Sequence, residues 1–207
     1  MTLTLFHHPY SRAAGTLWAL EEVGAPYELR FVDMPAGVHK GPELVAKNPM
    51  GKLPTLTDGE LVVTESAAIA LYLADRYAPG RLAPALDDPR RGTYLRWSLF
   101  APSVIEPGLM AKAGGWAYKA GQAGWGEYES MLRSMEAAVD GRDFVLGAEF
   151  SMADVIFGGT VRYMLRFGML EARPAFAAYV ARLDARPASQ RADAKNKAIA
   201  AEHGLKM

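Results

Sequence analysis

Cysteine is absent from this chain of 207 residues. The absence excludes structural disulfides, thiolate metal sites and cysteine nucleophiles together. Any thiol chemistry that the protein performs must therefore use a thiol that a substrate or cofactor brings.

An excess of one charge and long hydrophobic runs are also absent. The chain has 23 basic and 23 acidic residues and a formal net charge of zero. This balance argues against nucleic acid or an anionic membrane surface as the main partner. No apolar run is long enough to span a bilayer, and the segment 1–9 lacks the basic leader and long apolar stretch of a signal peptide. We therefore expect a cytoplasmic protein with no nucleic-acid and no membrane partner.

The first third of the chain has the element order of a thioredoxin-like α/β domain. Alternation of apolar residues indicates strands, and apolar residues three and four apart indicate helices. The expected elements are a strand at 2–6, a helix from 11 or 12 to 23, a strand at 27–33, a short helix at 43–46, a strand entered at 53–54, a strand at 61–64 and a helix ending at 77. We therefore predict a first domain over residues 1–78.

The rest of the chain has helical patterns only. Residues 78–88 contain Pro79, Gly80 and Pro84 and are typical of a linker. Helices are expected at 89–112, with an interruption at Pro102 and Pro107, and at 127–139, 152–167 and 174–186. No element is predicted for the polar segment after Arg186. The fold class is thus a thioredoxin-like α/β domain followed by an all-helical domain over residues 88–207.

The stretch 48–66 carries the strongest functional signal. A proline at a strand entrance lacks an N–H, and a cis bond at Leu53-Pro54 would leave the N–H and C=O of Leu53 open to an extended peptide. The helix that begins at Glu65-Ser66 offers unpaired N–H groups and a positive dipole end for a carboxylate. Together these features suit a small acidic peptide as the ligand.

Three segments, 11–27, 39–54 and 64–66, resemble the glutathione S-transferase family in their order and spacing. The first is similar to bacterial and fungal members, and the second is similar to the plant phi class. The resemblance implies the glutathione S-transferase architecture, glutathione as co-substrate and a homodimer. It also implies a small apolar electrophile as second substrate, held at a hydrophobic site to which the helical domain contributes.

The same resemblance implies roles for seven binding residues. Glu65 and Ser66 match the positions that hold the γ-glutamyl end of glutathione, Leu53 matches the residue whose backbone pairs with the cysteinyl part, and Pro54 matches the cis-proline. The positions that approach the glycyl carboxylate are matched by His39, Lys40 and Lys52. A helix start and a Ser hydroxyl suit one carboxylate, and a Lys or His suits the other.

The catalytic position lies in the loop before the first helix. The serine position of the tau and theta classes falls on Tyr10, beside Ser11, and the cysteine position of the beta class falls on Arg12. A hydroxyl from Ser11 or Tyr10 would lower the pKa of the glutathione thiol by stabilising the thiolate, and Arg12 would do so by charge. Ser11 also suits a helix cap, and Tyr10 also suits the wall of an apolar pocket.

The neighbouring pair His7-His8 does not predict a metal site, because adjacent residues of an extended segment point to opposite faces. The expected function is that of a glutathione transferase, which activates the glutathione thiol for attack on an electrophilic apolar substrate. The alternatives are another glutathione-dependent enzyme, such as a dehalogenase, peroxidase, isomerase or disulfide reductase, and a ligand-binding or interaction module without catalysis.

Overall fold

The computed structural model describes residues 2–206 and divides the chain into two compact units. One unit comprises the residues up to Tyr77 together with those from Arg186 onward, and the other comprises Ala78–Ala185. Among the described residues, no helix is long and apolar enough to cross a membrane.

The first unit is built on a sheet of four strands in the order β2-β1-β3-β4. Its strands are β1 (Leu3–His7), β2 (Tyr27–Phe31), β3 (Thr55–Asp58) and β4 (Leu61–Thr64). The β1 strand pairs in parallel with β2 and antiparallel with β3, and Leu3 and Leu5 of this central strand are buried. A two-residue turn after Asp58 joins β3 to β4, and Gly59 supplies the positive φ of 61° that such a turn requires.

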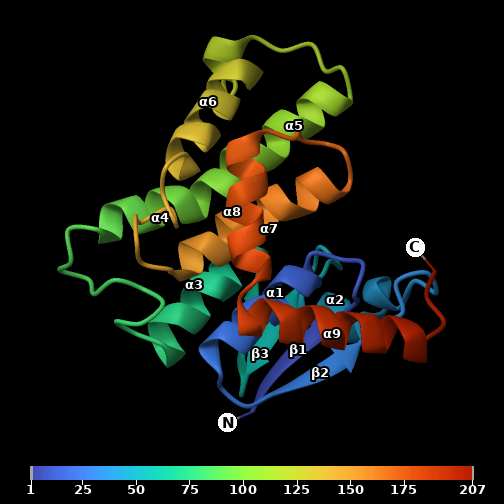
Figure 1. Cartoon of the computed structure of the whole chain (residues 1–207). Helices are drawn as coiled ribbons and strands as arrows, with labels where there is room; N and C mark the ends of the chain where they lie inside the picture. Colours follow the sequence, from blue (N-terminus) through green and yellow to red (C-terminus); the bar gives the residue numbers. More distant parts are fainter. Residues whose placement is uncertain (1, 207) are drawn as a thin grey trace. The chain divides into compact units, whose positions relative to one another are not determined.

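Helices α1 (Ala13–Val23), α2 (Pro42–Lys47) and α3 (Ser66–Tyr77) complete the thioredoxin-like part of this unit (Figure 1). The α1 helix ends at Gly24, whose φ of 75° is the left-handed conformation that glycine adopts at helix ends. The thioredoxin-like fold and the helical second part predicted from the sequence are confirmed.

The last helix differs from the sequence prediction. Residues 187–202 form α9, which lies beside α1 in the first unit (Figure 1), whereas we expected no element there and assigned residues 88–207 to the helical domain. A proline at its first position favours the helix start. The sequence pattern of α9 is mostly polar, so it does not reveal the face that docks.

Ion pairs with buried carboxylates attach α9 to α1. Arg186 forms a two-pronged contact with Glu22, with N···O distances of 2.7 and 2.8 Å. Arg191 and Lys195 contact Glu21 at 2.7 and 2.6 Å. Burial alone would raise the pKa of Glu21, but its hydrogen bonds, first that from Lys195, lower this pKa below its usual range. The docking of α9 therefore depends on charge pairs between residues more than 160 positions apart.

The second unit consists of helices and their connections. Its helices are α4 (Arg91–Phe100), α5 (Glu106–Ala113), α6 (Tyr128–Val139), α7 (Met152–Arg166) and α8 (Pro174–Asp184). A π-helical segment at Ala101–Ile105 separates α4 from α5. The interruption predicted from Pro102 and Pro107 is thereby confirmed, because a proline removes a hydrogen bond from the helical ladder.

A buried carboxylate organises the start of α7. Asp154 accepts hydrogen bonds from the backbone N–H groups of Val145 and Ser151, both at 2.9 Å, and from the hydroxyls of Ser151 at 3.1 Å and Tyr179 at 2.8 Å. With Ser151 it forms a capping box. Four donors on one buried carboxylate join α7, α8 and the preceding loop, so this motif has a structural role.

In the first unit, His7 at the end of β1 is fully buried. Neither ring nitrogen has a partner of hydrogen-bond geometry among residues 2–206, although the side chain of Asn196 in α9 lies near enough to influence its titration. Burial, the main cause, lowers the pKa of His7 from 6.5 to about 4. His7 is therefore neutral in the folded protein at pH 5 and above.

We predict that His7 makes folding stability depend on pH. Between pH 6.5 and about pH 4 the unfolded chain binds a proton at His7 that the folded chain does not. The free energy of unfolding should therefore fall as the pH is lowered through this window, by about 3 kcal/mol from this residue. Urea unfolding of the wild type and of His7→Leu at pH 7 and pH 4.5 measures the difference. Equal losses of stability in the two proteins would contradict the prediction.

Candidate functional site

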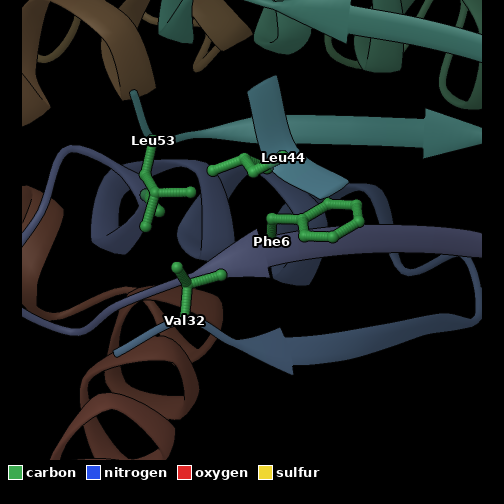
Figure 2. Packing of buried hydrophobic residues seen from close by; sticks show 5 residues of the cluster. Phe6, Val32, Leu44 and Leu53 are labelled. Carbon is green, nitrogen blue, oxygen red and sulfur yellow. The ribbon is translucent and has the colours of Figure 1, made fainter. Parts of the chain in front are cut away.

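A cluster of five buried side chains includes the predicted site residue Leu53 (Figure 2). Its members are Phe6, Ala13, Val32, Leu44 and Leu53. They come from β1, the start of α1, the segment after β2, α2 and the segment before β3. The cluster therefore fixes five separate pieces of chain that lead into the predicted site.

Leu53 joins this cluster through its side chain, while its backbone stays open. The side chain is 8% exposed, and the peptide bond between Leu53 and Pro54 is cis. Neither the N–H nor the C=O of Leu53 has a hydrogen-bond partner among residues 2–206, because β3 begins only at Thr55. Unpaired backbone groups next to a sheet are suited to pairing with an extended peptide.

Glu65 has a φ of +68°, a left-handed backbone conformation that residues other than glycine rarely adopt. It is the only such non-glycine residue in the described part of the chain. Its carbonyl accepts the N–H of Ile69 at 2.9 Å, so α3 begins directly after it and the first N–H groups of the helix, starting with that of Ser66, are unpaired by the helix. Such conformations cost about 1–3 kcal/mol and persist mostly at functional sites.

The Glu65 carboxylate is exposed and the Ser66 hydroxyl is half-buried. Within residues 2–206 neither side chain has a hydrogen-bond partner. The pair thus combines an acceptor for an ammonium group with a hydroxyl and N–H groups for a carboxylate.

The residues predicted to approach the glycyl carboxylate lie on two neighbouring turns. His39 and Lys40 end a short 3-10 helix at Val38–Lys40, and the Lys40 ammonium donates to the carbonyl of Met50 at 2.8 Å. A side chain on Gly51 would come within 2.9 Å of the backbone carbonyl oxygen of His39 and of the Lys40 side chain. This close approach requires glycine and brings the two turns together.

Lys52 is exposed and follows this contact directly. Its carbonyl accepts the Asn48 amide at 2.9 Å, which fixes its backbone and leaves its ammonium group in solvent. The backbone at Gly51, directly before Lys52 and Leu53, lies against the turn of His39 and Lys40. We name the three residues His39, Lys40 and Lys52 the basic edge.

The residues 8–12 between β1 and α1, named here the site loop, contain the candidate catalytic groups. The Ser11 hydroxyl donates to the carbonyl of His8 at 2.8 Å and accepts the N–H of Ala13 at 3.1 Å. This is the helix-capping arrangement expected as one alternative for Ser11. The single proton of the hydroxyl is engaged within the loop, so donation to a ligand requires the O–H to reorient.

Tyr10 forms one hydrogen bond through its backbone N–H and a longer one through its hydroxyl. Its N–H donates to Nδ1 of His8 at 3.2 Å, and its hydroxyl donates to the carbonyl of Leu205 at 3.4 Å. The side chain is 40% exposed. Arg12 follows at the position before α1 and is half-buried. The site loop thus brings Tyr10, Ser11 and Arg12 to the start of α1, where the helix dipole favours negative charge.

Two features near the site have no signal in the sequence. The left-handed conformation of Glu65 cannot be read from its residue type, since glutamate carries no preference for it. The contact of Leu205 with Tyr10 spans 195 residues along the chain. In the part of the chain that the structure describes, no group of three His, Cys, Asp or Glu side chains is arranged to hold a metal ion.

Comparison with known families gives two matches. Residues 1–75 match the model of the glutathione S-transferase N-terminal domain, and residues 118–182 match that of the glutathione S-transferase C-terminal domain. Together the two models cover most of the chain and both units of the fold.

Individual relatives agree with these matches. The chain is 29% identical to glutathione S-transferase 2 of Schizosaccharomyces pombe over 174 residues, which are 72% of this chain and 71% of the yeast protein. It is 49% identical to glutathione S-transferase 1 of Triticum aestivum over 74 residues, which cover 35% of this chain and only 32% of the wheat protein. The match to the wheat protein therefore spans only about a third of the length of that relative.

Solved structures extend the likeness to nearly the whole chain. A glutathione transferase of Phanerochaete chrysosporium, crystallised in complex with oxidized glutathione, has a TM-score of 0.79 at 26% identity and covers 96% of this chain and 97% of its own. A glutathione transferase of Methylococcus capsulatus has a TM-score of 0.77 at 25% identity, with 95% and 99% covered. With both domain models and the fold in agreement, this chain belongs to the glutathione S-transferase family.

Proposed function

We propose that the protein is a glutathione transferase, which binds glutathione and activates its thiol for attack on an electrophilic apolar substrate. The observation that carries the proposal is the open backbone of Leu53 in the same unit as the free start of α3 at Glu65-Ser66. Oxidized glutathione bound to a related glutathione transferase from Phanerochaete chrysosporium supports this choice of ligand class.

In this proposal each end of glutathione meets a different kind of group. The Glu65 carboxylate receives the γ-glutamyl ammonium, and the Ser66 hydroxyl and N–H receive the adjacent carboxylate. The backbone of Leu53 pairs with the cysteinyl part, and Pro54, which has no N–H, leaves that edge free of a competing donor. The two ends of the peptide thus determine the position of its thiol.

The opposite end of glutathione carries the glycyl carboxylate. We assign it to the basic edge of His39, Lys40 and Lys52, since a lysine ammonium forms charge-assisted hydrogen bonds with a carboxylate and an imidazole N–H donates to it. Lys40 keeps its contact with Met50 and still has further N–H donors for the ligand.

Thiol activation falls to the site loop. A hydrogen bond to a charged group contributes about 1.5–3 kcal/mol, and one between neutral groups contributes about 0.5–1.5 kcal/mol. Reorienting the Ser11 O–H from the carbonyl of His8 to a thiolate is therefore favourable. The thiol proton leaves to solvent, and the N–H groups at the start of α1 and Arg12 add to the stabilisation of the thiolate. The sulfur then attacks the electrophilic carbon with its electron pair, and that carbon either releases its leaving group as an anion or, where it belongs to an activated double bond, gives up the π electron pair, which takes a proton from water.

The first prediction from this function is a separation of binding from stability at Glu65. Glu65→Gly removes the carboxylate that receives the ammonium and also the cost of a left-handed side chain. It should weaken glutathione binding by roughly tenfold or more while raising the free energy of unfolding by up to about 1 kcal/mol. Calorimetry and urea unfolding measure the two quantities.

Two further variants complete this test, a control at Glu65 and a second binding variant at Ser66. Glu65→Gln keeps the strained backbone and loses only the charge, so it should weaken binding without the gain in stability. Ser66→Ala should weaken binding by roughly ten- to a hundredfold. Wild-type protein that fails to bind glutathione would contradict the proposed function. Binding without turnover of any general electrophile would favour the ligand-binding module instead.

A second prediction concerns the catalytic hydroxyl. Ser11→Ala should raise the apparent pKa of the bound thiol and reduce turnover at pH 6.5 more than at pH 9, whereas Tyr10→Phe should mainly change KM for the electrophile. Ser11→Thr keeps both the hydroxyl and the helix cap and serves as the matched control. The ultraviolet absorbance of the thiolate reports the pKa. If only Tyr10→Phe shifts it, the roles are reversed, and if neither does, no side-chain hydroxyl activates the thiol.

A third prediction is that the protein is a homodimer. Leu95 and Leu99 of α4, one turn apart, are 37% and 51% exposed, and such an apolar stripe suits the two-fold interface that is commonest among oligomers. Light scattering at micromolar concentration should give twice the chain mass of 22.5 kDa. Replacing both leucines with glutamate should give the monomer. Wild-type protein that is monomeric at this concentration would refute the dimer.

A further inference from the structure

The end of α9 contacts the site loop through a row of aromatic rings in the first unit. The His203 ring stacks on Phe31 with centroids 3.6 Å apart and planes 6° apart. Phe31 also stacks on His8, with centroids at 5.7 Å and planes at 30°, and the Tyr10 ring meets the edge of His8 at 5.8 Å. The row His203, Phe31, His8 and Tyr10 therefore joins residues that are 193 positions apart.

The hydrogen bond from the Tyr10 N–H to Nδ1 of His8 determines which nitrogen of the His8 ring carries the proton. An imidazole nitrogen that accepts a hydrogen bond carries no proton, so the proton of the neutral ring lies on Nε2. Turning the ring would lose the bond to Tyr10. The orientation of His8 therefore directly affects the conformation of the site loop.

The surroundings of His8 favour this neutral form. The ring is 4% exposed, and burial, the largest influence, lowers the pKa of His8. Asp33 opposes this change, and His203 and His39 add to it. At neutral pH the acceptor nitrogen that Tyr10 needs is thus present, and ring stacking holds it in place.

We propose that His203 is a positioning residue for the site loop. Its ring holds Phe31 and, through Phe31, the His8 orientation that accepts the Tyr10 N–H, and so it sets the place of Tyr10 and Ser11 beside the thiol. The effect on the thiol rests on the proposed function, whereas the effect on the loop does not. The carbonyl of Leu205, which accepts the Tyr10 hydroxyl at 3.4 Å, adds a second contact from the same segment.

Two substitutions of His203 separate the contribution of ring stacking from that of the imidazole group. A stacked pair needs a flat ring and not an imidazole as such. His203→Phe should therefore keep the loop in place, and His203→Ala should release it. Because His203 is exposed at the end of a helix, neither change is expected to prevent folding. Lys197→Ala provides a matched control, since Lys197 is exposed on the same helix and belongs to none of these ring contacts among the described residues.

The experiment first measures hydrogen exchange of the Tyr10 and Ser11 amides in the ligand-free protein at pH 7. His203→Ala should raise exchange at Tyr10 by about two- to tenfold, while His203→Phe and Lys197→Ala should match the wild type. Equal exchange in all four proteins overturns the proposal. So does His203→Phe behaving like His203→Ala, because the ring would then not be the contact.

The second measurement uses glutathione and the same four proteins. His203→Ala should raise the apparent pKa of the bound thiol and lower kcat, and His203→Phe should restore both values. An unchanged thiol pKa in His203→Ala overturns the link from the loop to the thiol. Wild-type protein that binds no glutathione refutes the proposed function, and the exchange result then still decides whether His203 positions the loop.

Discussion

Leu53 is fixed through its side chain and open along its backbone, and the rest of the candidate site depends on this combination. The side chain belongs to the buried cluster with Phe6, Ala13, Val32 and Leu44 (Figure 2). Its N–H and C=O groups have no partner among the described residues. Burying apolar surface is favourable in proportion to its area, so the cluster stabilises the fold and holds the unpaired backbone groups in place. One residue thus contributes to stability through its side chain and carries the backbone groups that we propose pair with the ligand.

Local signals in the sequence were sufficient for most elements, and the roles of the candidate site residues stay predictions. The turn at Asp58-Gly59, the helix end at Gly24 and the interruption at Pro102 each follow from the conformational limits of glycine and proline. These signals act over a few residues, so a single sequence reveals them. The helix at 187–202 was missed because its docking depends on ion pairs with the buried Glu21 and Glu22, which lie more than 160 positions earlier in the chain.

Long-range contacts also separate the two candidate hydroxyls in a way that the sequence does not show. Residue type and position make Ser11 and Tyr10 equally able to donate. The structure distinguishes them by partners: Ser11 bonds within its own loop, and Tyr10 contacts His8 and the distant Leu205. The partners of Tyr10 depend on the segment that follows α9 and on the rings of Phe31 and His203, which no local pattern connects. The two hydroxyls therefore differ in what holds them more than in their chemistry.

Glu65 shows how the site is prepared before a ligand arrives. A left-handed glutamate costs about 1–3 kcal/mol relative to an unstrained backbone, and a glycine there would avoid most of that cost. The strained residue presents a carboxylate and, directly after it, the free N–H groups of α3. A ligand with an ammonium and a carboxylate on the same carbon needs both partners at a fixed separation. The backbone cost is met during folding, so it is not subtracted from the free energy of binding.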